Sequence, residues 1–382
     1  MGAIGGCLGE RVSSKKKNQH FVPRHYLKRF SFDQGSQIRL FNLDIQKYVP
    51  EAPLKSQCSS SYFYGEDTSG ESILTEIEGI AEDLFGQICK DRDIPKSYSQ
   101  RLDLMTVLSL MHRRTRRHAE LDSGFIEVVT KRMIRMNPTL KNDSISTVLD
   151  RVRIRDRAAP LRSVKTSLCY PHLIFDLELR LIIAPAGKAF ITSDHPVILL
   201  NQAFFQTVES AAICGLASKG LQIFLPISPE FLVVAFDPGL YRVGSRRRTF
   251  YQIERDEDCE LINALQILNA EENLYFLDAG EIANIRALSI KFLRDRKKVD
   301  ESAKPVETPA AGSARGYLIK AAAPRIPIPG KWSFCKVLKQ ATPNDFGLRD
   351  PGLCRLMEEH IAVIRSGRTI SFDDWLAEQR AH

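Results

Sequence analysis

The feature that most constrains the fold is a change in the spacing of apolar residues along the chain. Between residues 68 and 136, apolar side chains recur every three or four positions, as in Ile73, Ile77, Ile80 and Leu84, which predicts helices. From residue 177 to 236, apolar residues instead form short continuous runs separated by Pro and Gly, which is typical of strands and turns. Helical spacing returns between residues 256 and 293.

These periods predict an α+β fold: an N-terminal helical half followed by antiparallel β-hairpins and closing helices. The predicted helices are 68–90, 97–136, 256–270 and 281–293, and an isolated strand is predicted near 37–43. The predicted hairpins pair 177–184 with 188–193 and 221–226 with 231–236. Strands and helices do not alternate, so the order excludes the parallel sheet of a Rossmann fold.

Composition divides the chain into four parts. Residues 1–17 are rich in Gly, Ser and Lys and are predicted to form a flexible basic arm, and residues 18–298 form the main α+β domain. Pro and Ala are frequent in residues 299–330, which predicts a linker. The segment 331–382 is too short to form a hydrophobic core of its own. We expect it to form a C-terminal helical tail that docks on the body or on a protein partner.

Cysteine usage and hydropathy indicate the compartment. The eight cysteines are scattered singly and contain no C-x-x-C pair, so neither a zinc site of cysteines nor a disulfide scaffold is predicted. Such scattered cysteines are typical of a reducing compartment. No run of about 18 uncharged apolar residues occurs, which argues against a transmembrane segment. The sequence therefore predicts a cytoplasmic protein.

The net charge of +8 is concentrated in two zones. Residues 1–30 contain seven basic residues and one acidic residue, and residues 101–165 contain fifteen basic and seven acidic residues. The remaining residues carry a net negative charge. Clustered basic residues attract polyanions, so a nucleic acid or a phosphorylated small molecule is the predicted partner.

The first candidate constellation is the segment from Gln19 to Phe30, which interleaves two histidines and three basic residues with aromatic residues. Val22-Pro23 favours an extended entry into a helix that starts near Arg24. His20 and Arg24 then lie at the start of that helix, where free backbone N–H groups favour an anion. The alternative is a solvated basic face above an aromatic anchor.

The second constellation is His112-Arg-Arg-Thr-Arg-Arg-His118. On a helix, Arg113 and Arg117 share one face, and so do Arg114 and His118. Four guanidinium groups so close together repel one another unless anions offset them, and phosphate suits the planar guanidinium fork. The alternative is a structural network with the acidic residues of the preceding helix: Glu76, Glu78, Glu82 and Asp83.

The third constellation is Phe190-Ile-Thr-Ser-Asp-His-Pro-Val197. A predicted strand ends at Ser193 and Pro196 stops the ladder, so Ser193, Asp194 and His195 lie on a tight turn, where site residues often gather. Asp194 and His195 are adjacent and point apart on an extended chain. Asp194 has three candidate roles: to bind a metal, to orient His20, or to cap the turn.

Together these segments resemble the bacterial family called domain of unknown function 4238. The resemblance covers roughly residues 18–295 and implies a bacterial soluble protein, with no agreed activity. Its matching motifs are Gln19-His-Phe-Val-Pro23 with Tyr26-Leu27 and Phe30, Tyr62-Phe-Tyr64 followed by the helix with Glu78, Arg114-Thr-Arg-Arg117, Thr192–Val197, Pro226-Ile-Ser-Pro229 and Asn263-Ala-Leu-Gln266.

Two functional hypotheses follow. In the first, the protein is a nuclease-like hydrolase that cleaves phosphodiesters, with His20, Glu78 and Asp194 as catalytic residues; the last two also bind a divalent metal such as Mg²⁺ or orient His20. The predicted phosphate-binding residues are Arg24, Arg113, Arg117 and Ser193. In the second, the chain is a non-catalytic module that binds nucleic acid or a protein. No phosphate loop, Rossmann fingerprint or nucleophile elbow is present to decide between them.

Overall fold

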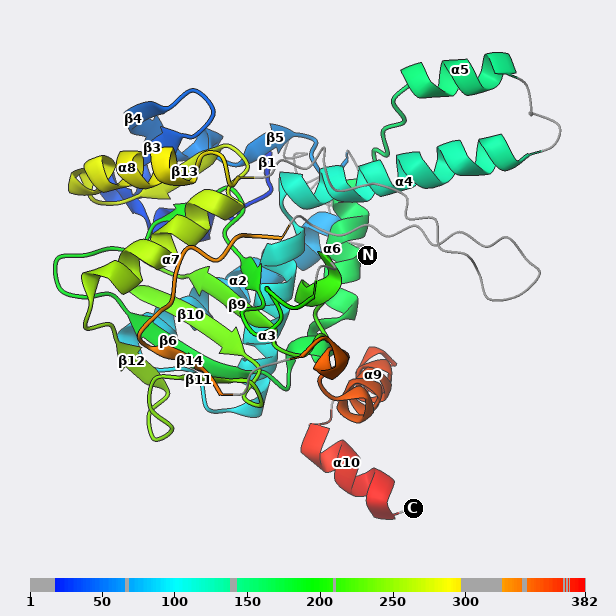
Figure 1. Ribbon diagram of the computed structural model, residues 1–382. Helices are drawn as coiled ribbons and strands as arrows, with labels where there is room; N and C mark the ends of the chain where they lie inside the picture. Colours follow the sequence, from blue (N-terminus) through cyan, green and yellow to red (C-terminus); the bar gives the residue numbers. More distant parts are fainter. Residues whose placement is uncertain are drawn as a thin grey trace, which may run out of the picture.

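The computed structural model describes residues 18–65, 69–137, 143–208, 211–296, 325–338, 342–366, 368, 370 and 372–381. The predicted arm and most of the predicted linker lie outside this set. The α+β class is confirmed (Figure 1). Five short strands precede the long helices, and they include the predicted strand at 37–43. Among the described helices, none is both long and apolar enough to span a bilayer.

A five-stranded sheet forms the centre of the molecule, in the order β12–β6–β10–β9–β8. Its neighbouring strands are antiparallel, except that β12 runs parallel to β6. The predicted hairpin of β9 and β10 is confirmed. The strand bounds are β6 Glu178–Ile183, β8 Ile198–Leu200, β9 Gln222–Pro226, β10 Phe231–Phe236 and β12 Phe250–Gln252.

Helices cover both faces of this sheet, with α7 on one side and α2 and α3 on the other (Figure 1). Side chains alternate between the two faces: Leu232 and Val234 pack into the core beside α7, whereas Val233 packs into the core beside α2 and α3. Because both faces of the sheet are buried, the sequence of β10 is a continuous run of apolar residues. The helices are α2 Ser69–Asp91, α3 Tyr98–Arg113, α7 Asp256–Asn269 and α8 Ile282–Phe292.

A second, smaller sheet has the order β2–β3–β13–β7, and β4 also pairs with β3. The buried hydroxyl of Tyr26 ties the two sheets together, because it lies 2.6 Å from Thr192 Oγ1 in β7 and donates to the carbonyl of Pro226 in β9 at 2.7 Å. The strands are β2 Ser31–Phe32, β3 Gln37–Asn42, β4 Lys47–Pro53, β7 Thr192–Ser193 and β13 Asn273–Phe276.

The predicted hairpin of 177–184 with 188–193 is wrong. Strand β6 pairs with β10 and β12, whereas β7 pairs with β13 in the other sheet. The segment between them bonds to a helix in place of β6: Asn263 of α7 accepts from the N–H of Ile191 at 3.0 Å and donates to the carbonyl of Ala189 at 2.9 Å. A side-chain amide thus satisfies backbone groups that strand pairing was expected to satisfy.

The C-terminal part packs on the body. Strand β14 (Cys335–Val337) pairs with β11 (Tyr241–Val243), and Trp332 and Phe334 enter the core beside α7. Helices α9 (Pro351–Arg365) and α10 (Phe372–Ala381) follow, as predicted, and Trp375 packs near Phe175 of the body. Arg349 is almost fully buried and donates to the carboxylate of Asp176 at 2.8 and 2.9 Å.

The remaining described elements complete the side of the molecule that carries the basic constellations. Helices α4 and α5 project from the body side by side (Figure 1). The bounds are β1 Asn18–His20, α1 Arg24–Lys28, β5 Ser59–Ser61, α4 Arg116–Met136, α5 Asp143–Arg151 and α6 Ala159–Cys169. Strand β1 pairs with β5, which places His20 opposite Ser59.

Candidate functional site

A break in the helix predicted at 97–136 positions the basic constellation. Arg114 leaves helical geometry, and Thr115 is extended with φ −84° and ψ 159°. Thr115 caps the new helix α4, because its hydroxyl oxygen accepts from the N–H of His118 at 3.4 Å. Arg113 therefore ends one helix and Arg117 lies in the first turn of the next. The expectation that they share a face is wrong.

The buried polar side of α7 holds the turn after β7. Gln266 accepts from the hydroxyl of Ser193 at 2.8 Å and donates to the carbonyl of Pro196 at 2.8 Å. Asn269 donates to the carbonyl of His195 at 2.5 Å. With Asn263, these residues stand three positions apart on one face of the helix, so one amide row fixes this turn.

Asp194 is the centre of a backbone clamp. Its carboxylate accepts from the N–H groups of Glu271 at 2.8 Å, Glu272 at 2.8 Å and Asn273 at 2.9 Å. Burial raises the pKa of Asp194 to about 6, and the three N–H donors act in the opposite direction. At pH 7 the ionised carboxylate thus holds the loop between α7 and β13 against the turn.

A small cleft of about 130 Å³ opens beside this clamp. Five segments that are distant in sequence meet there, and three of them carry parts of the first, second and third constellations. The lining residues are Phe21, Ser56, Gln57, Cys58, Ser59, Arg116, Arg117, Asp194, Glu271, Glu272, Asn273 and Tyr275.

The charged groups of the cleft face one another. Arg117 is 4% exposed and its Nη1 lies 3.4 Å from Glu271 Oε2, whereas Arg116 is 41% exposed and lies 3.8 Å from Glu272 Oε1. The guanidinium of Arg116 also stacks 5.1 Å from the ring centre of Phe21. Arg117 is thus committed to a buried ion pair, whereas the longer ion pair of Arg116 with Glu272 is exposed and Arg116 is the more accessible of the two to an incoming anion.

His20 belongs to a polar network next to the cleft. Its Nδ1 lies 3.1 Å from the carbonyl oxygen of Gln57, which can only accept, so Nδ1 carries the hydrogen and Nε2 holds the lone pair. Burial lowers the pKa of His20, although Glu78 opposes this shift. The ring is therefore neutral at pH 7 and suited to accept a proton.

Glu78 is held by an arginine of that network. Its Oε1 lies 2.8 Å from Nη1 of the buried Arg114, and its Oε2 lies 4.0 Å from Nδ1 of His25. Arg114 also donates to the backbone carbonyl of His20 at 2.9 Å. Within the described residues, this is the one ion pair that links the second constellation to the acidic residues of α2.

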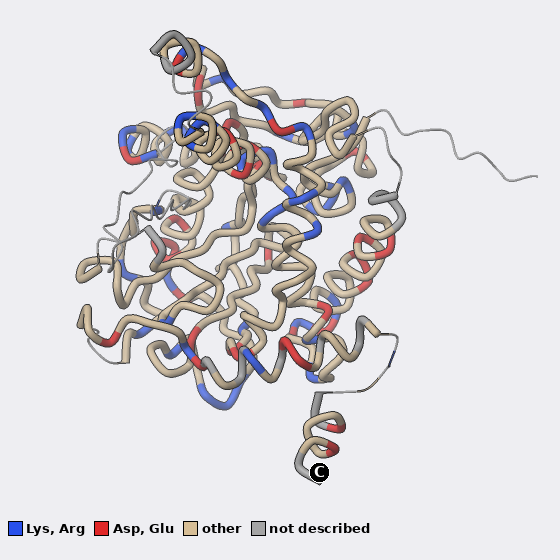
Figure 2. Tube along the Cα trace, turned by 90° about the vertical axis from the view of Figure 1, so that its right-hand side faces the viewer, with Lys and Arg blue, Asp and Glu red and all other residues tan. Residues whose placement is uncertain are grey.

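A larger groove of about 730 Å³ lies along α4 and the segment that joins α5 to α6. Arg153, Arg155 and Arg157 line it, are exposed, and stand at alternate positions of the joining segment. Lys131 lines it as well but is paired with Glu127 at 2.6 Å. Figure 2 shows basic and acidic positions interspersed on this side of the molecule. Arg116 lines both the groove and the cleft.

The other predicted phosphate ligands lie away from the cleft lining. Arg113 donates to both oxygens of Asp122, at 3.1 and 3.0 Å. Ser193 is fully buried and has no surface through which to bind a phosphate. Arg24 is exposed at the start of a helix of only five residues. Arg117 alone among the four predicted phosphate ligands lines the cleft.

The described residues contain one cluster of at least three close metal-ligating groups: His112, His118 and His195. Neither of the predicted metal ligands belongs to it, because Glu78 pairs with Arg114 and Asp194 holds three backbone N–H groups. The magnesium site of Glu78 and Asp194 stays a prediction. His195 was noticed in the sequence only as part of a turn.

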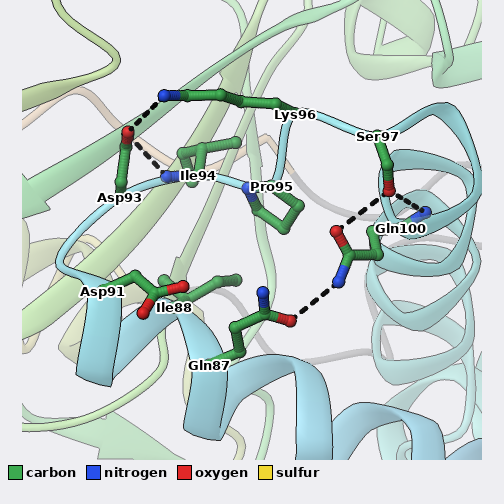
Figure 3. Close-up of a pocket in the computed structure, with 9 residues that line it drawn as sticks. All are labelled: Gln87, Ile88, Asp91, Asp93, Ile94, Pro95, Lys96, Ser97 and Gln100. Atoms are coloured by element: carbon green, nitrogen blue, oxygen red, sulfur yellow. Dashed lines mark hydrogen bonds and ion pairs between the residues drawn. The ribbon is translucent and has the colours of Figure 1, made fainter.

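Another pocket, of about 430 Å³, lies between the end of α2 and the start of α3 (Figure 3). Its polar side chains bond mostly to one another: Gln100 donates to Gln87 at 2.7 Å, and Lys96 pairs with Asp93 at 3.5 Å. None of the predicted site residues lines it. It is therefore not part of the candidate site.

Of the twelve residues that line the cleft, Arg117 and Asp194 were predicted site residues; those that sequence reasoning missed include Cys58, Arg116, Glu271 and Glu272. Arg116 was within the second constellation, but a continuous helix was assumed there. In the sequence, Glu271 and Glu272 are two acidic residues after the predicted helix and carry no sign of a site. The bonds of their N–H groups to the Asp194 carboxylate place them at the cleft. Cys58 is buried beside Tyr275, and burial raises the pKa of its thiol, so it is not a reactive thiolate at pH 7.

Comparison with known proteins supports the resemblance and adds no activity. No curated protein and no solved structure matches the chain. The family model described as "Protein of unknown function (DUF4238)" matches residues 18–280, which is more than half of the chain and includes every segment that lines the cleft. The chain therefore belongs to the DUF4238 family.

Proposed function

We propose that this protein binds nucleic acid along the groove beside α4 and cleaves a phosphodiester at the adjoining cleft. The observation that carries the proposal is that Arg116 lines both. A nucleic-acid strand whose phosphates are bound by Arg153, Arg155 and Arg157 would run past Arg116 and place its next phosphate in the cleft. A cytoplasmic location, where nucleic acid is available, is part of this proposal.

In the proposed reaction, water attacks phosphorus, the bond to the leaving oxygen breaks, and the leaving alkoxide takes up a proton from the solvent. His20 takes the proton of the attacking water at Nε2, since its Nδ1 is held by Gln57. Arg116 offsets the charge that develops on the phosphoryl oxygens. Arg117, which is buried and paired with Glu271, adds to the positive potential at the cleft.

The second candidate function is binding without catalysis. It is favoured by the pairing of the buried charges: Arg114 with Glu78, Arg117 with Glu271, and Asp194 with three backbone N–H groups. In that case the exposed arginines of the groove grip nucleic acid and the cleft is structural. A protein partner for the C-terminal tail also stays a prediction.

The direct test is a cleavage assay on end-labelled single-stranded RNA, single-stranded DNA and duplex DNA, with added Mg²⁺ and without it. We expect His20→Gln to lower the cleavage rate about 10²- to 10⁴-fold. The rate of the unmodified protein should fall as the pH drops below the lowered pKa of His20, because its base becomes protonated.

His25→Gln is the matched control, because His25 lies near the same glutamate, whereas His20 is the histidine bonded to Gln57 of the cleft lining. We expect it to keep its cleavage rate. An equal rate in His20→Gln would remove His20 from the reaction, and no cleavage of any of the three substrates would favour the binding module.

A further inference from the structure

Three histidines from separate segments meet behind the wall of the cleft. His112 lies in the last turn of α3, His118 in the first turn of α4, and His195 in the turn after β7. The ring centres of His112 and His118 are 4.3 Å apart, those of His118 and His195 5.2 Å, and those of His112 and His195 5.9 Å. One nitrogen from each ring lies within 4.8 Å of the other two.

Two of these rings carry a buried nitrogen without a hydrogen-bond partner. Nδ1 of His112 and Nδ1 of His118 are both inaccessible to water and unbonded. Buried polar atoms are nearly always satisfied, and an ion is one explanation when they are not. The Nδ1 atoms of these two adjacent rings are therefore both available to one ligand that lies between the rings.

The opposite ring nitrogens of His112 and His195 are held in the way that those of metal-binding histidines usually are. Nδ1 of His195 lies 2.8 Å from Oγ1 of Thr115, which leaves Nε2 for a ligand. His112 bonds to the carbonyl of Val197, and because its Nδ1 has no partner this bond is donated by Nε2. Such contacts fix the tautomer and the ring orientation of a ligating imidazole.

The charge around the cluster permits a cation. Burial is the main cause that lowers the pKa of all three histidines, that of His112 to about 3, so the imidazoles are neutral at pH 7. The two nearest cations are already neutralised, since Arg113 pairs with Asp122 and Arg117 with Glu271. Neutral imidazole is the form in which histidine binds a metal.

We propose that His112, His118 and His195 bind one divalent ion of the zinc class. Three imidazoles with an open fourth position for water are a common set for Zn²⁺. Zinc–nitrogen bonds of about 2.0–2.1 Å place tetrahedral ligand nitrogens roughly 3.4 Å apart, so small rotations of the rings close the site.

The site would fasten three segments that build the cleft. His118 follows Arg117 and His195 follows Asp194, so an ion at the cluster fixes the backbone beside two cleft residues. This role is one of positioning and is independent of whether the cleft cleaves nucleic acid. Metal binding therefore tests the proposal separately from nuclease activity.

The test uses the full-length chain without an affinity tag, stripped with a chelator and then dialysed against ZnCl₂. We expect one zinc per chain by mass spectrometry of the metal content, and a melting temperature several degrees higher than in the stripped protein. With CoCl₂ we expect the intense visible absorption of tetrahedral Co²⁺.

His195→Asn and His112→Gln are the test variants, since each retains an amide for the bond to Thr115 or Val197 and removes the ligand nitrogen. Both should lose the zinc, the cobalt absorption and the zinc-dependent rise in melting temperature. His172→Gln alters a buried histidine outside the cluster and should keep all three. Zinc absent from the unmodified chain, or retained in both cluster variants, would overturn the proposal.

Discussion

Replacement of Asp194 by alanine is expected to lower the free energy of unfolding by about 3–5 kcal/mol, as for other buried charged networks that lose one partner. The substitution removes the acceptor of three backbone N–H groups, of Glu271, Glu272 and Asn273, and each buried donor left without a partner carries its own cost. The loop between α7 and β13 would then lose its anchor. Chemical denaturation monitored by circular dichroism measures the difference.

Asp278→Ala is a suitable control for this measurement. The carboxylate of Asp278 also accepts from a backbone N–H, that of Gly280 at 2.8 Å, but the residue is exposed and water replaces the bond. We expect a loss of less than about 1 kcal/mol. Equal losses in the two variants would show that the clamp on Asp194 contributes little to stability.

The metal-free protein is expected to lose stability steeply as the pH falls below 6.5. His112, His118 and His195 stay neutral in the folded protein, because burial and neighbouring cations lower their pKa, whereas in the unfolded chain they take up protons near pH 6.5. Protons bind to the unfolded chain first, so stability is present above pH 6.5 and is lost on acidification. Each such histidine contributes about 1.4 kcal/mol per pH unit.

Asp194 works in the opposite direction, because a carboxyl whose pKa is raised to about 6 takes up its proton in the folded protein first. It cancels the effect of one histidine at most. These four groups together give an expected loss of about 3 kcal/mol per pH unit between pH 6 and 5, and the lowered pKa values of His20 and His25 add to it. Urea denaturation at a series of pH values, with a chelator present, measures this slope.

His112→Gln should lower this slope by about 1.4 kcal/mol per pH unit, since one titrating group is removed. A slope unchanged in the variant, or stability that stays constant from pH 7 to 5, would mean that the cluster is protonated in the folded protein.

The helices and the hairpin of β9 and β10 were predictable because their apolar spacing reflects the faces they bury. Strand β7 was not predictable, since its partner β13 lies about 80 residues further along the chain and side chains of α7 satisfy the backbone on either side of β7. Long-range pairings of this kind leave no local pattern in one sequence. The same holds for β14, which joins β11 from beyond the predicted linker.

The candidate site shows the same division. The three constellations were visible because unusual residues are adjacent in each, and the structure brings Arg117 and Asp194 to one cleft, with His20 beside it. The break at Thr115 was not visible, although it decides which arginine reaches the cleft. Thr115 is a good N-cap, but a threonine within an Arg-rich helix carries no further mark of a boundary. The pairing of Glu271 with Arg117 depends on that break.

The most direct test of the central claim is the salt dependence of binding to a single-stranded oligonucleotide. The unmodified protein is compared with a variant in which Arg153, Arg155 and Arg157 are all glutamine. Each lost phosphate contact should reduce the slope of log Kd against log salt by about 0.7, so the variant should lose about two units of slope and bind several-fold more weakly.

The matched control replaces Arg246, Arg247 and Arg248 by glutamine. These are three exposed arginines outside the groove, so the control makes the same change in net charge. The account predicts that only the groove variant changes slope; equal slopes in both variants, or no binding by the unmodified protein, would contradict it.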